Sequence, residues 1–151
     1  MMVFAAAAMG RLMEPHNPNW KARCEAGFLA QEVMGTLGVT IADIAPGRVV
    51  LEMPFNAAFT QHHGFLHAGT VTTALDSACG FAAFTLMPQD REVLTVEFKS
   101  NFLSPAKGAA FRFEGEVVKS GRTLSVTRGT AFADGVAIST MQATMMAVTT
   151  P

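Results

Sequence analysis

The sequence predicts an α+β fold in which one antiparallel sheet wraps around one long helix. Two observations predict it. The apolar segment 69–86 has the length of a helix, and the stretches around it alternate between apolar and polar residues as strands do. The order is one helix, two strands, the long helix and four strands, which a single helix-on-sheet arrangement can bury. The 151 residues suffice for one such domain and are too few for two ordinary ones.

The first predicted element is an additional N-terminal helix that begins at Asn17-Pro18. Asparagine commonly caps a helix, and proline fits its first position. Apolar residues then recur at helical spacing: Trp20, Cys24, Phe28, Leu29 and Val33. The glycines within 35–38 end this helix. Residues 1–16 are expected to be a flexible N-terminus, and 17–151 a single domain.

Strands are predicted on both sides of the long helix. Before it, 39–44 and 48–55 flank a short turn at 45–47 that contains proline and glycine. After it come four strands: 93–103, 110–118, 123–132 and 136–148. The pair Asp134-Gly135 between the last two is typical of a hairpin turn.

The long helix and the strand 93–103 each show two distinct faces. One side of the helix is apolar: Val71, Leu75, Ala78, Ala82 and Leu86. The other side carries small residues and one acid: Gly69, Thr73, Asp76, Gly80 and Ala83. Because small side chains leave a groove, Asp76 is expected at its middle. In the strand, one predicted face is apolar: Leu94, Val96, Phe98 and Phe102. The other is polar: Thr95, Glu97, Lys99 and Asn101.

The composition excludes several classes of protein. Half of the residues are hydrophobic, 15% are charged and the net charge is −1, so nothing predicts binding to nucleic acid. So apolar a chain is typical of subunits that bury surface in an oligomer. No membrane span is expected, because the longest apolar stretch, 71–87, contains Asp76 and several hydroxyls. Cys24 and Cys79 are expected to be buried thiols of a reducing, cytoplasmic compartment.

The segment 61–76 carries the chemistry that the sequence predicts. It places a small turn directly before the long helix, and one carboxylate, Asp76, two turns into that helix. A free backbone N–H at a helix start can hold a developing negative charge. A carboxylate inside an apolar helix is costly unless it has a role or a partner. Together these features indicate acyl-transfer chemistry.

Two other chemistries are not favoured. The three histidines His62, His63 and His67 suggest a metal, but no cysteine or second carboxylate stands at ligand spacing, so no metal site is predicted. Ser77 has neither a general base at hydrolase spacing nor a nucleophile-elbow sequence, which argues against a serine triad.

Two spaced motifs carry a resemblance to a known family. They are His67-Ala68-Gly69 with Asp76 downstream, and Thr95-Val96-Glu97 leading to Ser104-Pro105-Ala106-Lys107. Over roughly residues 25–150 the chain resembles the hotdog-fold acyl-CoA thioesterases, in the branch of the phenylacetate-pathway (PaaI-like) enzymes and the Arthrobacter-type 4-hydroxybenzoyl-CoA thioesterase. The resemblance implies a hotdog fold and hydrolysis of an acyl-CoA thioester. It implies no cofactor, because coenzyme A is part of the substrate.

The resemblance assigns roles to five residues. The backbone N–H of Ala68, where the family usually has glycine, would hold the oxyanion. His67 would orient the turn through a hydrogen bond. Asp76 would act as general base or as nucleophile. Gln61 would polarise the thioester or hold the water, and Thr95 would position the water.

The resemblance also implies how the substrate and the subunits meet. Substrate contacts are expected at Gly69, Gly80, Lys99 and Lys107. In the family the site lies between two subunits, so Asp76 of one would work with Gln61 and Ala68 of the other. A homodimer or a homotetramer built from two dimers is therefore expected, joined through the strand 93–103.

Two alternative functions remain open from the sequence. A hydratase or dehydratase of acyl thioesters on the same fold relies on a paired histidine and acid, which His67 and Asp76 could imitate. A non-catalytic acyl-CoA-binding protein is the second alternative. Such sensors usually add a DNA-binding module, for which the short N-terminal segment has no room.

Overall fold

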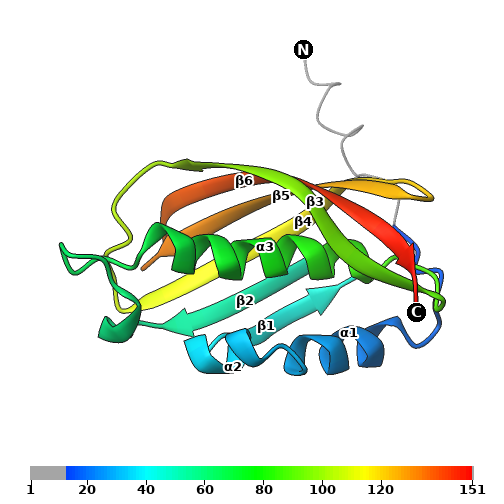
Figure 1. Cartoon of the computed structure of the whole chain (residues 1–151), viewed down its shortest axis with the longest axis horizontal. Helices are drawn as coiled ribbons and strands as arrows, with labels where there is room; N and C mark the ends of the chain where they lie inside the picture. The colour runs from blue at the N-terminus through cyan, green and yellow to red at the C-terminus, as the bar shows by residue number, and fades with distance from the viewer. Residues whose placement is uncertain (1–12, 151) are drawn as a thin grey trace, which may run out of the picture.

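The computed structural model describes residues 13–150 as one α+β fold (Figure 1). The helices are α1 (Trp20–Leu29), α2 (Glu32–Leu37) and α3 (Ala68–Phe84), with a short 3-10 turn, η1 (Ala57–Phe59), before α3. The strands are β1 (Thr40–Ala45), β2 (Arg48–Pro54), β3 (Arg91–Phe102), β4 (Ala110–Ser120), β5 (Leu124–Ala133) and β6 (Val136–Thr149). The predicted long helix and six predicted strands are confirmed, with ends that agree within two residues.

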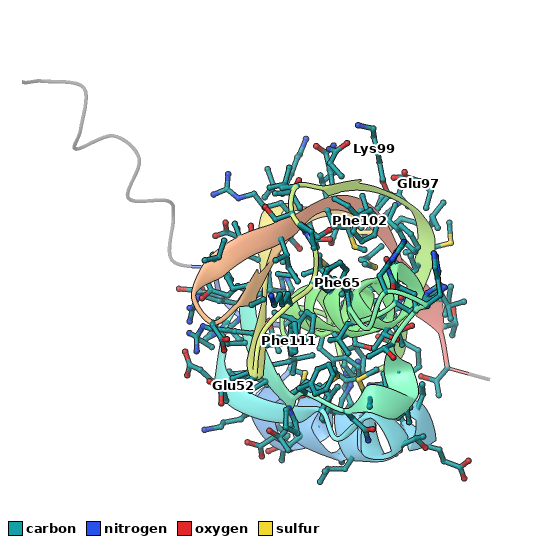
Figure 2. All side chains as sticks on the ribbon, turned by 90° about the vertical axis from the view of Figure 1, so that its left-hand side faces the viewer. Glu52, Phe65, Glu97, Lys99, Phe102 and Phe111 are labelled. Atoms are coloured by element: carbon teal, nitrogen blue, oxygen red, sulfur yellow. The ribbon has the colours of Figure 1, made fainter. Side chains whose placement is uncertain are left out.

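The six strands form one antiparallel sheet in the order β1-β2-β4-β5-β6-β3. Figure 1 shows α3 lying along this sheet, with α1 and α2 beside β1. Figure 2 looks from one end of the molecule and shows the sheet curving around α3. The predicted arrangement, a sheet wrapped around one helix, is confirmed.

Two glycines let α3 approach the sheet closely. Gly115 of β4 and Gly129 of β5 are paired across the two strands. A Cβ atom on Gly115 would lie 2.3 Å from the carbonyl carbon of Ala78, and one on Gly129 would lie 2.7 Å from Cδ1 of Leu75. Such distances leave no room for a side chain, so the backbone of α3 rests directly on the strands. This contact sets the distance between the sheet and α3, the helix that carries Asp76.

The N-terminal helix differs from the prediction of one continuous helix. The chain forms α1 and α2, with a break before α2 at Gln31. Leu29 is 80% exposed and Val33 is 46% exposed, so the predicted apolar stripe ends at Phe28. The side chains buried after the break are Met34 and Leu37. The spacing of Met34 and Leu37 from Phe28 does not place all three on one face of a single helix. The break before α2 allows all three to be buried.

The predicted cap at Asn17 also differs in detail. The helix α1 begins only at Trp20. Asn17 is buried, its Oδ1 accepts a 2.9 Å hydrogen bond from the N–H of Asn19, and its carbonyl accepts one from the N–H of Trp20. Asn17 therefore starts a turn that leads into the helix instead of capping the helix itself.

The segment 1–16, expected to be flexible, is only partly described, because residues 1–12 lie outside the described residues. Met13 packs against the core, and the N–H of His16 donates a 3.3 Å hydrogen bond to the carbonyl of Leu86. Over residues 13–150, none of the helices combines the length and the hydropathy that a membrane span requires.

A β-bulge in β3 changes which residues share a face. Thr95 pairs with Met145 and Glu97 pairs with Thr144, which leaves Val96 as the extra residue. Directly paired residues point to the same side of a sheet, and Met145 is buried in the core. Thr95 therefore faces α3, whereas Glu97 bonds to the Thr144 hydroxyl on the outer face.

The bulge overturns the predicted alternation of this strand. Leu94 pairs with Met146 on the outer face, whereas Phe98 pairs with the buried Ala143 on the helix side. The prediction that Leu94 and Phe98 share a face is wrong, as is the one that Thr95 lies with Glu97. A shift of one residue reverses every side chain that follows it.

Candidate active site

His67 fixes the start of α3. Its backbone is extended, with φ −61° and ψ 140°, and its Nδ1 accepts a 2.8 Å hydrogen bond from the N–H of Gly69. The carbonyl of His67 accepts hydrogen bonds from the N–H groups of Thr70 and Val71. Within residues 13–150, no acceptor is bonded to the N–H of Ala68, the first residue of the helix. This N–H is therefore available to a negative charge.

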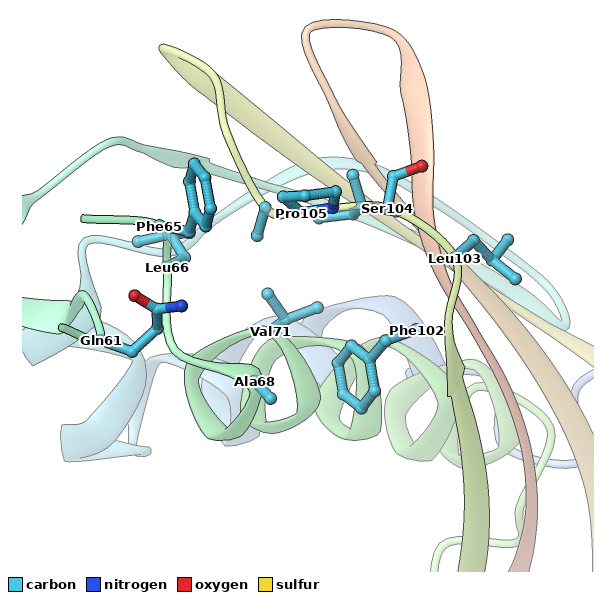
Figure 3. A pocket seen from close by; sticks show the side chains of 11 residues that line it. Gln61, Phe65, Leu66, Ala68, Val71, Phe102, Leu103, Ser104 and Pro105 are labelled. Carbon is cyan, nitrogen blue, oxygen red and sulfur yellow. The ribbon is translucent and has the colours of Figure 1, made fainter. Parts of the chain in front are cut away.

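A cavity of about 500 Å³ opens beside this turn and is called the Gln61 cavity below (Figure 3). Gln61 and Ala68 line it together with mainly apolar side chains, among them Phe65, Val71 and Phe102. Figure 3 shows these side chains facing the same space. An apolar cavity with a few polar groups is typical of a small-molecule site.

The loop before α3 holds Gln61 in place. Its N–H donates a 2.8 Å hydrogen bond to the carbonyl of Phe65, and its carbonyl accepts a 2.9 Å bond from the N–H of Gly64. The side-chain Oε1 accepts from the N–H of His63. The Nε2 group is therefore the part of this amide that remains to donate to a ligand.

A second cavity, of about 270 Å³, is called the Asp76 cavity. Asp76 and Thr95 line it, and the Thr95 hydroxyl donates a 3.0 Å hydrogen bond to Oδ1 of Asp76. Burial raises the pKa of Asp76 above 3.8, and the bond from Thr95 opposes this rise. Thr95 faces Asp76 because it pairs with the buried Met145, and the bulge at Val96 comes after it in the strand. A partly desolvated carboxylate in a cavity, with one defined partner, is typical of a catalytic acid or base.

Within one chain, the N–H of Ala68 and the carboxyl of Asp76 lie far apart. Asp76 follows Ala68 by eight residues in α3, a separation of roughly 12 Å along the helix axis. They also line different cavities. A general base and an oxyanion donor each need to lie about 3 Å from their reacting atoms. The two groups of one chain therefore cannot act on the same carbonyl.

The predicted substrate-binding residues fall in different places. Gly80 lines the Asp76 cavity and Gly69 belongs to the turn at His67. Lys107 is exposed and follows the loop that borders the Gln61 cavity. Lys99 pairs with Gln142, so it lies on the outer face of β3 with Glu97 and points away from α3 (Figure 2).

Gln31 and Ser77 also line the Asp76 cavity, and the sequence did not indicate either as a binding residue. The Ser77 hydroxyl donates a 3.1 Å hydrogen bond to Oε1 of Gln31. Gln31 reaches α3 because the N-terminal helix breaks there. The failed periodicity between Phe28 and Met34 is the signal that indicates the break.

The histidines do not assemble a metal centre in the described part of the chain. Residues 13–150 contain no group of three or more histidine, cysteine or acidic side chains placed to hold an ion. His62 and His63 lie against each other, with ring centroids 4.0 Å apart. His67 uses its Nδ1 to cap α3.

Comparisons with known proteins place the chain in a family. Residues 63–139, about half of the chain, match the family described as the Thioesterase superfamily, and the chain belongs to it. A crystal structure of a thioesterase family protein from Silicibacter pomeroyi is 56% identical, with a TM-score of 0.84, over 87% of this chain and 99% of that one. Human acyl-coenzyme A thioesterase 13 is 30% identical over 92 residues, which are 59% of this chain and 64% of that protein.

A more distant structure shares the fold alone. The E. coli PaaI protein from the phenylacetic acid degradation operon is 16% identical, with a TM-score of 0.79, over 88% of this chain and 96% of that one. The resemblance to hotdog thioesterases is therefore confirmed, and the chain is a thioester hydrolase.

Proposed function

We propose that the protein hydrolyses acyl-CoA thioesters to a free acid and coenzyme A. The observation that carries the proposal is the half-buried Asp76, which lines a cavity and accepts a hydrogen bond from Thr95. It lies on α3, whose first N–H, that of Ala68, bonds to no acceptor within residues 13–150. Human acyl-coenzyme A thioesterase 13, a relative at 30% identity, supports coenzyme A as the thiol. The reaction needs no cofactor, because coenzyme A belongs to the substrate.

In the general-base route, Asp76 takes a proton from water while the water oxygen forms a bond to the thioester carbon. The carbonyl oxygen becomes an oxyanion, which the Ala68 N–H and the positive end of α3 stabilise. The C–S bond then breaks and the proton returns to the thiolate. In the nucleophile route, a carboxylate oxygen of Asp76 attacks the carbon instead, and the C–S bond breaks to release the coenzyme A thiolate and leave an anhydride. Water later hydrolyses this anhydride to the free acid and the Asp76 carboxylate, and the released proton goes to the thiolate. Both routes require Asp76 to be ionised.

The supporting residues follow from their places around the two groups. Thr95 holds the carboxylate and is positioned to orient water beside it. Gln61, whose Nε2 remains available, polarises the thioester carbonyl. His67 orients the turn that carries the Ala68 N–H, through the hydrogen bond that its Nδ1 accepts from the N–H of Gly69. Lys107 beside the Gln61 cavity is the basic residue best placed to meet a phosphate of coenzyme A.

We infer that the active site is shared between two subunits. The separation of Ala68 from Asp76 within one helix supports this inference, in which Asp76 of one subunit works with Gln61 and Ala68 of a second. Among the described residues, β3 bonds to β6 on one side only. It exposes several large apolar side chains: Leu94 57%, Val96 52%, Phe98 43% and Phe102 51%. An edge strand of this kind is suited to pairing with its own copy.

The hydratase alternative gains no support from this geometry. The ring of His67 already caps α3, since its Nδ1 accepts a hydrogen bond from the N–H of Gly69, which gives it a structural role at the helix start.

The proposal is tested with purified protein and a panel of acyl-CoA thioesters. We expect release of free thiol in a disulfide-exchange dye assay, and no hydration of crotonyl-CoA in a parallel assay of its double bond. Hydration without thiol release would overturn the proposal in favour of a hydratase. Tight binding of acyl-CoA with neither reaction would identify a non-catalytic binding protein.

A further inference from the structure

Gln31 presents an unpaired amide group at the Asp76 cavity. Its Oε1 accepts from the Ser77 hydroxyl, whereas its Nε2 is shielded from solvent and has no partner among the described residues. A buried donor without an acceptor is costly, and most such groups in folded proteins are satisfied by protein, water or ligand. An atom of a bound ligand would satisfy this one.

The rest of the cavity is suited to an acyl group. Phe81 and Phe84 line it with their rings at 90° and their centroids 5.8 Å apart. Gly27 and Gly80 also line it and add no side chain of their own, which leaves space between α1 and α3. The cavity thus combines apolar walls with one polar position at Gln31.

The charges at the cavity limit what the acyl group can carry. Asp76 and Glu92 both line it, and no lysine or arginine does so among the described residues. Two carboxylates repel an anionic acyl group, such as one that ends in a second carboxylate. The free Nε2 of Gln31 is a donor and requires an acceptor. A neutral oxygen satisfies both conditions.

We propose that Gln31 is a specificity-determining residue, which donates its Nε2–H to a neutral carbonyl or hydroxyl oxygen on the acyl group of the substrate. This inference rests on the proposed thioesterase function, because it names the acyl group of that same site. Ser77 is a positioning residue that holds the Gln31 amide at the cavity wall. The break between α1 and α2 is what delivers Gln31 to the site.

The test compares matched pairs of straight-chain acyl-CoAs. One member of each pair carries a ketone on the acyl chain and the other does not, and the position of the ketone differs from pair to pair. The parent protein should prefer one ketone position over its plain partner. In Gln31→Met, which keeps the length of the side chain, kcat/KM on that ketone should fall about tenfold, and kcat/KM on the plain partner should stay within about twofold. Gln142→Met, the same change on an exposed residue of β6, should alter neither.

Two further measurements keep the outcome decisive. Ser77→Ala should weaken the ketone preference without removing it, and circular dichroism should show each variant folded. Binding of non-hydrolysable thioether analogues, measured by calorimetry, tests the same preference without turnover. If the protein hydrolyses none of the acyl-CoAs but still binds the ketone-bearing analogues more tightly, only the proposed thioesterase function is contradicted. Equal loss on both members of every pair, or no ketone preference in the parent, would overturn the role of Gln31.

Discussion

The Thr95 hydroxyl donates a 3.0 Å hydrogen bond to Oδ1 of Asp76, and this contact opposes the effect of burial on the carboxyl. Burial raises the pKa of Asp76 above 3.8, while the hydrogen bond lowers it. Thr95 faces α3 because it pairs with the buried Met145, and the bulge at Val96 then places Glu97 on the outer face. The register of β3 therefore acts on the pKa of a carboxyl on the helix that the strand covers.

Thr95→Val should move the acidic limb of the pH profile of kcat/KM to higher pH. Catalysis requires the carboxylate form of Asp76, so this limb reports the pKa of its carboxyl. Valine keeps the shape of threonine and removes the bond that lowers this pKa, which leaves burial unopposed. Thr95→Ser keeps a hydroxyl and should leave the limb in place. A limb that stayed still or moved to lower pH in Thr95→Val would contradict the role of this bond.

Asp76→Asn should abolish most turnover and leave the fold intact. Loss of a general base typically lowers the rate by about 10²–10⁴. Asparagine keeps the size of the side chain, and its amide oxygen can still accept from Thr95. The measurement is kcat with an acyl-CoA substrate, alongside a thermal unfolding curve. Activity equal to that of the parent would remove Asp76 from the mechanism.

The same variant carries a pH signature in stability. The folded pKa of Asp76 is raised, so the favourable contribution of this carboxyl is fully present below its unfolded pKa and is lost as the pH rises through its folded pKa. Asp76→Asn should therefore be at least as stable as the parent at pH 7, and this relative gain should shrink in acid. Urea unfolding at several pH values measures it. A variant clearly less stable at pH 7 would show that the carboxylate stabilises the fold.

Ala68→Pro should lose activity while remaining folded, and Ala68→Gly should keep activity. Ala68 is the first residue of α3, a position that proline tolerates, and His67 already has the extended backbone that a following proline requires. The proline variant therefore removes the N–H with little effect on the helix. Loss of one oxyanion donor costs about 2.7–4 kcal/mol, or about 10²–10³ in kcat. A folded proline variant with unchanged kcat would place the oxyanion elsewhere.

The regular part of the fold could be predicted from the sequence, because it follows from local patterns. Alternation locates the strands, and the Asp134-Gly135 pair marks a hairpin in which both residues have positive φ, 45° and 81°. The break at Gln31 and the bulge at Val96 were missed. The bulge depends on tertiary packing that local periodicity does not record. The break is marked in the sequence only by the spacing between Phe28 and Met34, which does not fit one helix face.

The part of the candidate site that could be predicted from the sequence also follows from local patterns. His67, Ala68 and Asp76 are close in sequence and belong to one helix, so their spacing already carries information. Gln31 and Ser77 lie far apart along the chain, and only the packing of α1 and α2 against α3 brings them together. Lys99 lies on the outer face of β3 by its register, and its expected contact with the substrate stays a prediction.

Gly115→Ala should destabilise the protein. The added Cβ would lie 2.3 Å from the backbone of Ala78, so α3 and β4 must separate. Overpacking of this kind typically costs about 1–3 kcal/mol, which denaturant unfolding resolves. Gly35→Ala is the matched control, because no atom of residues 13–150 lies within 4 Å of a Cβ there. It should be neutral or stabilising, and equal stability of the two variants would show that the close approach of α3 is not needed.

Two inactive variants, Gln61→Ala and Asp76→Ala, should restore activity when their subunits are mixed. In a shared site Gln61 comes from one subunit and Asp76 from the other. A mixed dimer then has one site with both defects and one intact site. An equal mixture that assorts at random should recover about a quarter of the parental activity, since half of the dimers are mixed and half of their sites are intact.

Subunits are exchanged by co-refolding, and native mass spectrometry of a size-tagged variant confirms that mixed dimers form. If mixed dimers are present and no activity returns, all catalytic groups lie within one chain, and α3 must then bend or shift to bring Ala68 toward Asp76. If light scattering shows an active monomer, the interface through β3 is not part of the enzyme.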